Sequence, residues 1–308
     1  MEAATAAAPK KPGKVTGRAR EERRLAYMLI APAVIVMLLV TGYPIVYAIY
    51  LSMQKFDLRF PDDKEFVGFS NYADVLTSSL WWSDVFNTFL ITICSVALEL
   101  VLGMLIALVM HRAIFGRGPV RAAILIPYGI VTVVAAFAWR YAFDPGTGFV
   151  SNLPLISDSA DPLSERGGSF LVIVLAEVWK TTPFMALLLL AGLALVPDEL
   201  HEAAKVDGAS VWQRFWKITI PLMKPAIVVA LLFRTLDAFR IFDTVFITTR
   251  GANDTETVSV LGYNVLINRV NLGLGSAVSV LIFLAVILIA MFFVKVLGAS
   301  TAQQRGET

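Results

Sequence analysis

Six long apolar stretches dominate the pattern of hydrophobic and polar positions along the chain. A helix needs about 20 predominantly apolar residues to cross the hydrocarbon core of a bilayer. Stretches of that length cover residues 26–51, 86–110, 120–142, 169–195, 223–248 and 274–297. The pattern therefore predicts an all-α, polytopic membrane protein with six transmembrane helices.

Basic residues are distributed unevenly among the connections between these stretches. They concentrate before the first stretch, between the second and third, and in the polar segment 197–222. Because Lys and Arg in short loops are retained on the cytoplasmic side, both termini and segment 197–222 are expected in the cytoplasm. We predict three parts: a disordered basic tail (residues 1–24), a transmembrane domain (25–298) and a short tail (299–308).

Composition supports a membrane protein and excludes several kinds of site. The chain is 57% hydrophobic and 16% charged, whereas soluble domains carry about 25% charged residues. Cys94 is the single cysteine, and the two histidines, His111 and His201, lie far apart. No metal site is therefore expected. We also expect no nucleic-acid partner for the basic tail, because it adjoins a membrane span.

Charged residues inside the apolar stretches are the first candidate functional groups. In the fifth stretch, Arg234, Asp237, Arg240 and Asp243 recur every third residue with alternating sign. Neighbours at this spacing touch on a helix, so an intrahelical ladder of ion pairs is one interpretation. A polar wall for a hydrophilic solute is the other. Phe239 beside the charges would suit a sugar, whose CH faces pack on aromatic rings.

The fourth stretch contains a second charged pair, Glu177 and Lys180, again three residues apart. These two form either a local salt bridge or the facing wall of the same cavity. The candidate cavity residues are Glu177, Lys180, Asp237, Phe239, Arg240 and Asp243.

Glu99 in the second stretch has no basic neighbour in its local run. Charges at bilayer depth are costly, so Glu99 either pairs with a charge on another helix or takes up a proton. The second possibility would suit a proton-coupled secondary transporter of a small polar solute, which is the alternative function. Neither a GxxxxGK[ST] phosphate loop nor a GxSxG nucleophile motif occurs in the chain, so we do not expect the chain to be an enzyme.

The polar segment carries a more specific pattern. It reads Glu202-Ala203-Ala204, then Asp207-Gly208-Ala209, and later Ile220-Pro221 and Pro225. These residues resemble the EAA loop of binding-protein-dependent ABC importer permeases. Further similarity to the maltose-permease-like group of this family extends over nearly the whole chain, for example at Tyr43-Pro44-Ile45 and Pro183-Phe184. One departure is Arg250-Gly251-Ala252-Asn253, where many members have Gly-Gly-Pro.

The resemblance implies a type I ABC importer permease with several partners. They are a second homologous permease, two cytoplasmic ATPase subunits that hold ATP and Mg²⁺, and an external sugar-binding protein or lipoprotein. This chain itself would hold no cofactor. The resemblance also implies that the EAA segment is a coupling helix that docks on an ATPase. Its coupling residues would be Glu202, Ala203, Ala204, Asp207, Gly208 and Ala209.

Within this family, residues 125–134 and 225–240 look particularly similar to permeases of trehalose importers. The expected function is therefore import of a disaccharide, trehalose, across a bacterial cell membrane. Alternating access driven by the partner ATPases would move the sugar. No side-chain pattern here distinguishes trehalose from another disaccharide, so the substrate rests on the resemblance alone.

Overall fold

The computed structural model describes residues 17–112, 117–150 and 161–305. The chain divides into two compact units, Met1–Tyr50 and Leu51–Thr308. Residues 1–16 and 306–308, which belong to the two predicted tails, lie outside the described residues. Residues 17–24 and 299–305 belong to the same predicted tails but are helical. A helix that is already nucleated extends at little cost beyond its apolar stretch, which accounts for the difference.

The first unit is built from the first apolar stretch. Helix α1 (Gly17–Met37) continues through a π-helical turn, η1 (Leu38–Gly42), into α2 (Tyr43–Ser52), which ends just beyond the unit boundary. The π-helical turn ends two residues before Pro44. Proline lacks the N–H that would bond four residues back, so a local change of helical pattern is expected at this place.

The second unit begins with a short hairpin and a small helix. Strands β1 (Gln54–Lys55) and β2 (Glu65–Phe66) pair antiparallel. Helix α3 (Ser70–Thr77) follows, and the buried Asn71 amide donates to the carbonyls of Ser52 and Gln54 at 2.8 Å each. In the hairpin loop, hydrogen bonds from Arg59 lower the pKa of Asp57 to about 2. The carboxylate of Asp57 therefore stays ionised, and its ion pair with Arg59 persists, at physiological pH.

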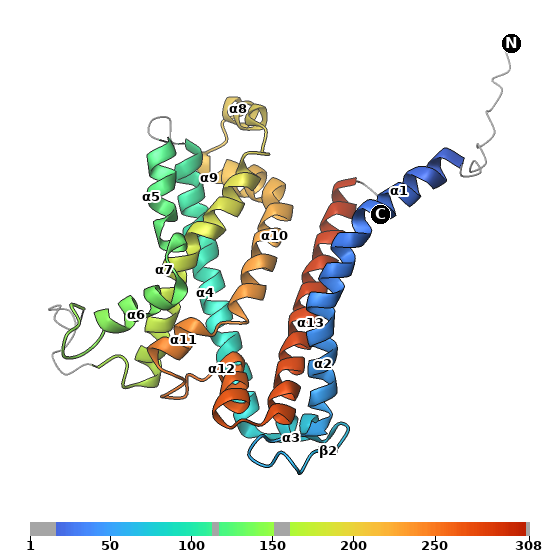
Figure 1. Cartoon of the computed structure of the whole chain (residues 1–308). Coiled ribbons are helices and arrows are strands. Elements are labelled where there is room, and N and C mark those ends of the chain that lie inside the picture. Colours follow the sequence, from blue (N-terminus) through green and yellow to red (C-terminus); the bar gives the residue numbers. More distant parts are fainter. Residues whose placement is uncertain (1–16, 113–116, 151–160, 306–308) are drawn as a thin grey trace. The chain divides into compact units, whose positions relative to one another are not determined.

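Long apolar helices form the body of the second unit (Figure 1). They are α4 (Ser79–Arg112), α7 (Arg166–Leu193), α10 (Ile220–Ala238) and α13 (Leu272–Arg305). Helix α10 continues a span that starts in α9 (Val211–Arg214) and passes through η2 (Phe215–Thr219). A buried apolar cluster joins α4, α7 and α10 through Met104, Met185 and Met223.

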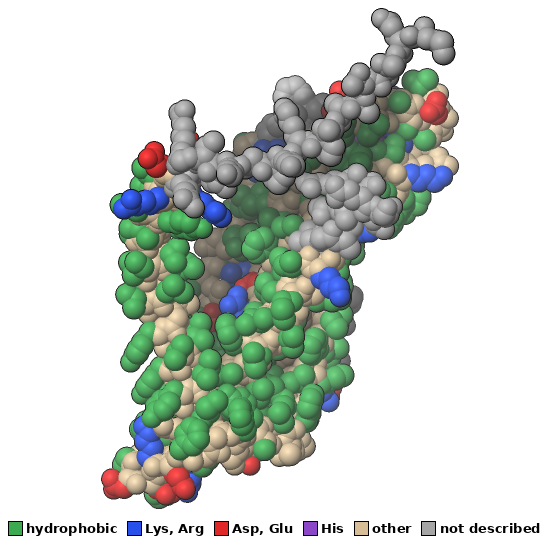
Figure 2. Space-filling view, turned by 90° about the vertical axis from the view of Figure 1, so that its right-hand side faces the viewer, with side chains coloured by type: hydrophobic (Ala, Val, Ile, Leu, Met, Phe, Trp, Pro, Cys, Tyr) green, Lys and Arg blue, Asp and Glu red, His purple; other side chains and the backbone are tan. Residues whose placement is uncertain are grey.

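Two of the predicted spans are interrupted. The third consists of α5 (Arg117–Gly129) and α6 (Thr132–Ala142), which are bent by 84° after Pro127. The described residues therefore contain 5 helices able to span a membrane, or 6 if this bent pair is one span. Figure 2 shows hydrophobic side chains over much of the face drawn, as expected for surfaces that meet lipid or other apolar partners.

The fifth predicted span, 223–248, is wrong at its C-terminal end. Helix α10 ends at Ala238, and α11 (Asp243–Thr248) begins after a non-helical break. The break is stabilised by one local and one tertiary contact. Arg240 Nε donates to the carbonyl of Leu236 at 3.1 Å, and Thr257 Oγ1 donates to that of Ile241 at 3.3 Å. Side chains thus satisfy carbonyls that a continuous helix would have bonded itself.

The chain between α11 and α13 forms α12 (Val258–Tyr263) and a π-helical turn, η3 (Asn264–Asn268). The start of α13 then docks on the hairpin. Gly273 N donates to Phe56 O at 3.0 Å, and Leu58 N donates to Val270 O at 3.0 Å. A Cβ added at Gly273 would lie 2.0 Å from the carbonyl oxygen of Gln54, so only glycine fits there.

Gly273→Ala is therefore expected to destabilise the protein by about 1–3 kcal/mol, as overpacking at a well-fitted site does. The obstacle is backbone and cannot rotate away. Melting temperature of the purified protein measures the effect. Gly118→Ala is the matched control, because a Cβ at Gly118 meets nothing within 4 Å. Equal melting temperatures for the two variants would contradict the packing argument.

Candidate functional site

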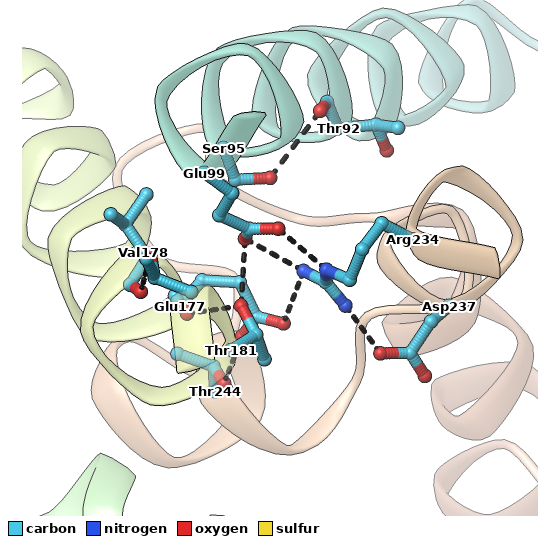
Figure 3. Close-up of polar contacts among 10 residues, drawn as sticks. Thr92, Ser95, Glu99, Glu177, Val178, Thr181, Arg234, Asp237 and Thr244 are labelled. Atoms are coloured by element: carbon cyan, nitrogen blue, oxygen red, sulfur yellow. Dashed lines mark hydrogen bonds and ion pairs between the residues drawn. The ribbon is translucent and has the colours of Figure 1, made fainter. Parts of the chain in front are cut away.

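A buried polar cluster joins four helices of the second unit (Figure 3). At its centre is Arg234 of α10, whose side chain is 1% exposed. Its Nε lies 2.5 Å from Glu99 Oε2 and its Nη2 lies 2.7 Å from Glu99 Oε1. Nη2 is also 3.5 Å from Glu177 Oε1 on α7, and Nη1 is 2.5 Å from Asp237 Oδ2. One guanidinium thus forms ion pairs with three carboxylates.

Two threonines complete the cluster. Thr181 Oγ1 lies 2.7 Å from Glu99 Oε1 and 2.6 Å from the carbonyl of Glu177. Because a hydroxyl carries a single proton, it donates to one of these acceptors at a time. Thr244 Oγ1 of α11 donates to Glu177 Oε2 at 3.0 Å. The cluster therefore ties the short helix after the break to the long helices α4 and α7.

This arrangement decides between the two possibilities for Glu99. Glu99 pairs with a charge on another helix, the guanidinium 135 residues further along the chain. The bidentate guanidinium balances the negative charge of the buried carboxylate, so Glu99 does not need a proton to be stable there. The lone charge in an apolar stretch was the signal for a partner, but the sequence did not identify which residue it was.

The ladder of ion pairs, one of the two interpretations of the fifth stretch, extends only over its first step. Arg234 and Asp237 form an ion pair, but within the described residues no ion pair joins Asp237 to Arg240 or Arg240 to Asp243. The physical reason is the end of α10 at Ala238, since the i, i+3 geometry requires a continuous helix.

The local salt bridge between Glu177 and Lys180, one of the two interpretations of this pair, is also absent from the part of the chain that the structure describes. Glu177 is 7% exposed and contacts Arg234 and Thr244 instead. The ammonium nitrogen of half-buried Lys180 lies 5.5 Å from the centre of the Tyr128 ring. This cation–π contact places Lys180 against α5.

The six candidate cavity residues thus differ in accessibility. Asp237 and Arg240 are exposed, and Lys180 and Asp243 are half-buried. Glu177 and Phe239 are buried, and the Phe239 ring packs edge-to-face on Phe89 with ring centres 5.3 Å apart. The faces of Phe239 are therefore not free for a sugar in this structure. Sequence reasoning named Glu99 and Arg234 as charged candidates but not as cavity residues, and it did not find Thr181 and Thr244.

The two interrupted spans meet beside this cluster. Helix α6 packs against α11, and Arg140 Nη1 donates to the carbonyl of Ile247 at 3.0 Å. Both helices also pack against α7. Non-helical backbone at membrane depth is tolerated only where protein buries it or where it lines a water-filled cavity.

A second site lies in the polar segment, where α8 (Asp198–Val206) forms. Pro197 precedes the helix in an extended conformation, Asp198 and Glu199 lie in its first turn, and Lys205 lies in its last. Acidic residues near the positive end of a helix and a basic residue near its negative end both stabilise it.

Gly208 ends this helix with a Schellman motif. Ala209 N donates to Ala204 O at 2.8 Å, and Gly208 N donates to Lys205 O at 3.1 Å. Gly208 has φ +80°, in the left-handed region that favours glycine. A Cβ there would meet nothing within 4 Å, so the need for glycine is conformational and not steric.

The predicted coupling residues lie at the surface of this segment. Glu202, Ala203, Asp207 and Gly208 are exposed, and Ala204 and Ala209 are half-buried. Sequence reasoning did not find the apolar side chains that accompany them. Val206 is 87% exposed, and Trp212 of the following α9 is 69% exposed. Helices with such surfaces are usually covered by a partner.

Comparison with known proteins identifies the family. Residues 68–303 match the model of the "Binding-protein-dependent transport system inner membrane component". The trehalose transport system permease protein SugA of Mycobacterium tuberculosis is 57% identical over 285 residues, which cover 92% of each chain. The trehalose/maltose transport system permease protein MalF of Thermococcus litoralis is 39% identical over 89% of this chain and 94% of its own.

The fold has solved counterparts as well. A chain of a bacterial alginate ABC transporter, solved in complex with an alginate pentasaccharide-bound periplasmic protein, superposes with a TM-score of 0.76. The alignment covers 91% of this chain and 96% of the other, at 20% sequence identity. The fold is therefore the all-α type I ABC importer permease fold. Nothing in these comparisons supports a proton-coupled secondary transporter. The chain belongs to the family of binding-protein-dependent transport system inner membrane components, the multi-pass membrane permeases of ABC importers.

Proposed function

We propose that this chain is a permease subunit of an ATP-driven trehalose importer. Trehalose is proposed as the substrate because the chain is 57% identical to a trehalose permease over 92% of its length. The 39% identical relative, named for trehalose and maltose, supports a disaccharide. The exposed charged groups Asp237 and Arg240, with half-buried Lys180, agree with a solute rich in hydroxyl groups.

The proposed complex contains a second homologous permease, two cytoplasmic ATPase subunits and an external sugar-binding protein. ATP and Mg²⁺ belong to the ATPase subunits, and this chain supplies no cofactor site. The uneven distribution of Lys and Arg favours cytoplasmic termini in a bacterial cell membrane. The same orientation places α8 in the cytoplasm, where it would dock on an ATPase.

The exposed surface of α8 suits this docking. Glu202 can accept a charge-assisted hydrogen bond, and Ala203 leaves room for close approach. Val206 and Leu200 add apolar area, since they are 87% and 45% exposed. We infer that Glu202, Ala203, Ala204, Asp207, Gly208 and Ala209 form the contact with the ATPase, together with these two apolar side chains.

A continuous span would carry movement from α8 toward the buried cluster. The Ser210–Gln213 capping box starts α9 directly after α8. The span Val211–Ala238 has 28 residues, which at about 1.5 Å per residue is roughly 40 Å long. Its far end carries Arg234 and Asp237. Closure of the ATPases around ATP would thus displace this span and open the path outward, and hydrolysis would reverse the movement.

Within the path, we propose that exposed Asp237 and Arg240 and half-buried Lys180 contact the sugar. Half-buried Asp243 lies at the start of α11, just beyond the break. Glu177 and Phe239 are buried and would not contact the sugar directly. Glu177 stabilises Arg234, and Phe239 packs on Phe89.

Uptake of labelled trehalose by cells with and without the gene for this chain tests the substrate and the energy source. Loss of the gene is expected to abolish uptake, and the intact gene restores it. Unlabelled maltose and sucrose serve as competitors for specificity. Unchanged trehalose uptake without the gene would refute the substrate. Uptake that stops with an uncoupler while cellular ATP is held constant would favour proton coupling instead.

A further inference from the structure

The contacts of Arg234 run in one direction, from the protein interior to an accessible surface. The side chain of Glu99 is 0% exposed, that of Glu177 is 9% exposed and that of Asp237 is 65% exposed. Arg234 thus contacts two enclosed carboxylates on other helices and one accessible carboxylate on its own helix. Figure 3 shows the guanidinium between Glu99 and Asp237.

The guanidinium is fixed on its buried side. Two of its nitrogens, Nε and Nη2, bind the two oxygens of Glu99 at 2.5 and 2.7 Å. This fork-to-fork geometry sets the plane of the guanidinium, which a lysine ammonium cannot do. Glu99 is itself held by Thr181 at 2.7 Å. Only Nη1 extends to Asp237, at 2.5 Å from Oδ2.

Asp237 is therefore an accessible carboxylate in a fixed orientation. In the described part of the chain, its side chain accepts a hydrogen bond from Arg234. The second oxygen, Oδ1, remains available to a solute. A sugar hydroxyl donates to carboxylate oxygens, and a carboxylate that is already ordered loses less freedom on binding than a mobile one.

We propose that Arg234, anchored by Glu99, is a positioning residue that presents Asp237 to the transported sugar. This inference rests on the proposed function, in which Asp237 contacts the sugar. It gives the enclosed ion pair a role in sugar affinity beyond stability. Glu99 acts two contacts away from the solute, and its effect passes entirely through Asp237.

The test measures trehalose affinity of the purified importer complex without its binding protein, trapped with ATP and vanadate. Omitting the binding protein matters because its own affinity would otherwise dominate. Asp237→Asn is expected to weaken binding about tenfold, the effect of losing one charge-assisted hydrogen bond. Glu99→Gln, which keeps the shape but weakens the anchor, is expected to weaken it severalfold.

The decisive comparison is the double variant. If Glu99 acts only through Asp237, adding Glu99→Gln to Asp237→Asn causes no further loss, because the carboxylate being positioned is already gone. Additive losses would overturn the proposal, and so would wild-type affinity in Glu99→Gln. Thr92→Val is the matched control on the same helix. Its hydroxyl has no hydrogen-bond partner in the part of the chain described, and wild-type affinity is expected.

If the Glu99→Gln complex fails to assemble, Thr181→Val is used in its place in the same double-variant comparison. Thr181→Val removes one hydrogen bond that holds Glu99. Failure of the proposed function has a different signature. A complex that imports another disaccharide overturns trehalose as substrate, and the cycle is then measured with that sugar. Unchanged affinity in Asp237→Asn overturns Asp237 as a sugar contact and, with it, the positioning role.

Discussion

Replacing Gly208 with proline is expected to abolish sugar uptake while the membrane-spanning helices still form. Proline fixes φ near −65°, whereas Gly208 has φ +80°. Its ring also removes the N–H that donates to Lys205 O in the Schellman motif. The end of α8 would unravel, and the proposed docking surface would lose its shape. Uptake of labelled trehalose and co-purification of the ATPase subunits measure the effect.

The control for this variant is Gly208→Asn. Asparagine tolerates the left-handed conformation better than other non-glycine residues, and a Cβ at this position meets nothing within 4 Å. Most of the uptake should therefore remain. Full uptake in Gly208→Pro, or equal losses in both variants, would show that the turn after α8 does not matter for coupling.

Replacing Arg234 with methionine is expected to prevent accumulation of folded protein. The change leaves Glu99 and Glu177 enclosed without their cation. Breaking a buried ion pair from one side costs about 3–5 kcal/mol, which is a large part of the 5–15 kcal/mol that stabilises a typical protein. The amount of protein in the membrane and the melting temperature of any purified protein measure the loss.

The double variant Glu99→Met, Arg234→Met is the matched control. It removes both partners of the bidentate pair, and apolar residues of similar volume often replace a buried pair with little loss of stability. Glu177 stays enclosed without its cation, so only part of the accumulation should return. A single variant Arg234→Met that melts like the wild-type protein would mean that water or another cation compensates the carboxylates.

The determinants of the helix in the polar segment, which the resemblance implied, are local. Acidic residues at the start of α8, Lys205 in its last turn and Gly208 two residues after Val206 all act within the segment. The capping box of Ser210 and Gln213 is equally local. The exposure of Val206 and Trp212 was not predictable, because it depends on what the rest of the chain leaves uncovered.

The charged cluster shows the opposite case. Arg234, Asp237, Arg240 and Asp243 form a regular pattern in the sequence, and a continuous helix would have made them a ladder. The break after Ala238 depends on Phe239 packing on Phe89 and on Thr257 reaching the carbonyl of Ile241. Neither contact can be read from the pattern of the fifth stretch itself.

The sequence by itself determined the all-α membrane fold and the approximate place of each span, and its resemblance to the permease family implied the helix of the polar segment. These features follow from runs of apolar residues and from contacts between residues a few positions apart. Only the tertiary structure decided that Glu99 pairs with Arg234, that Glu177 contacts Thr244 and not Lys180, and that α10 ends at Ala238. Each of these depends on helices distant in the sequence, where burial makes one partner far more favourable than the nearest one along the chain.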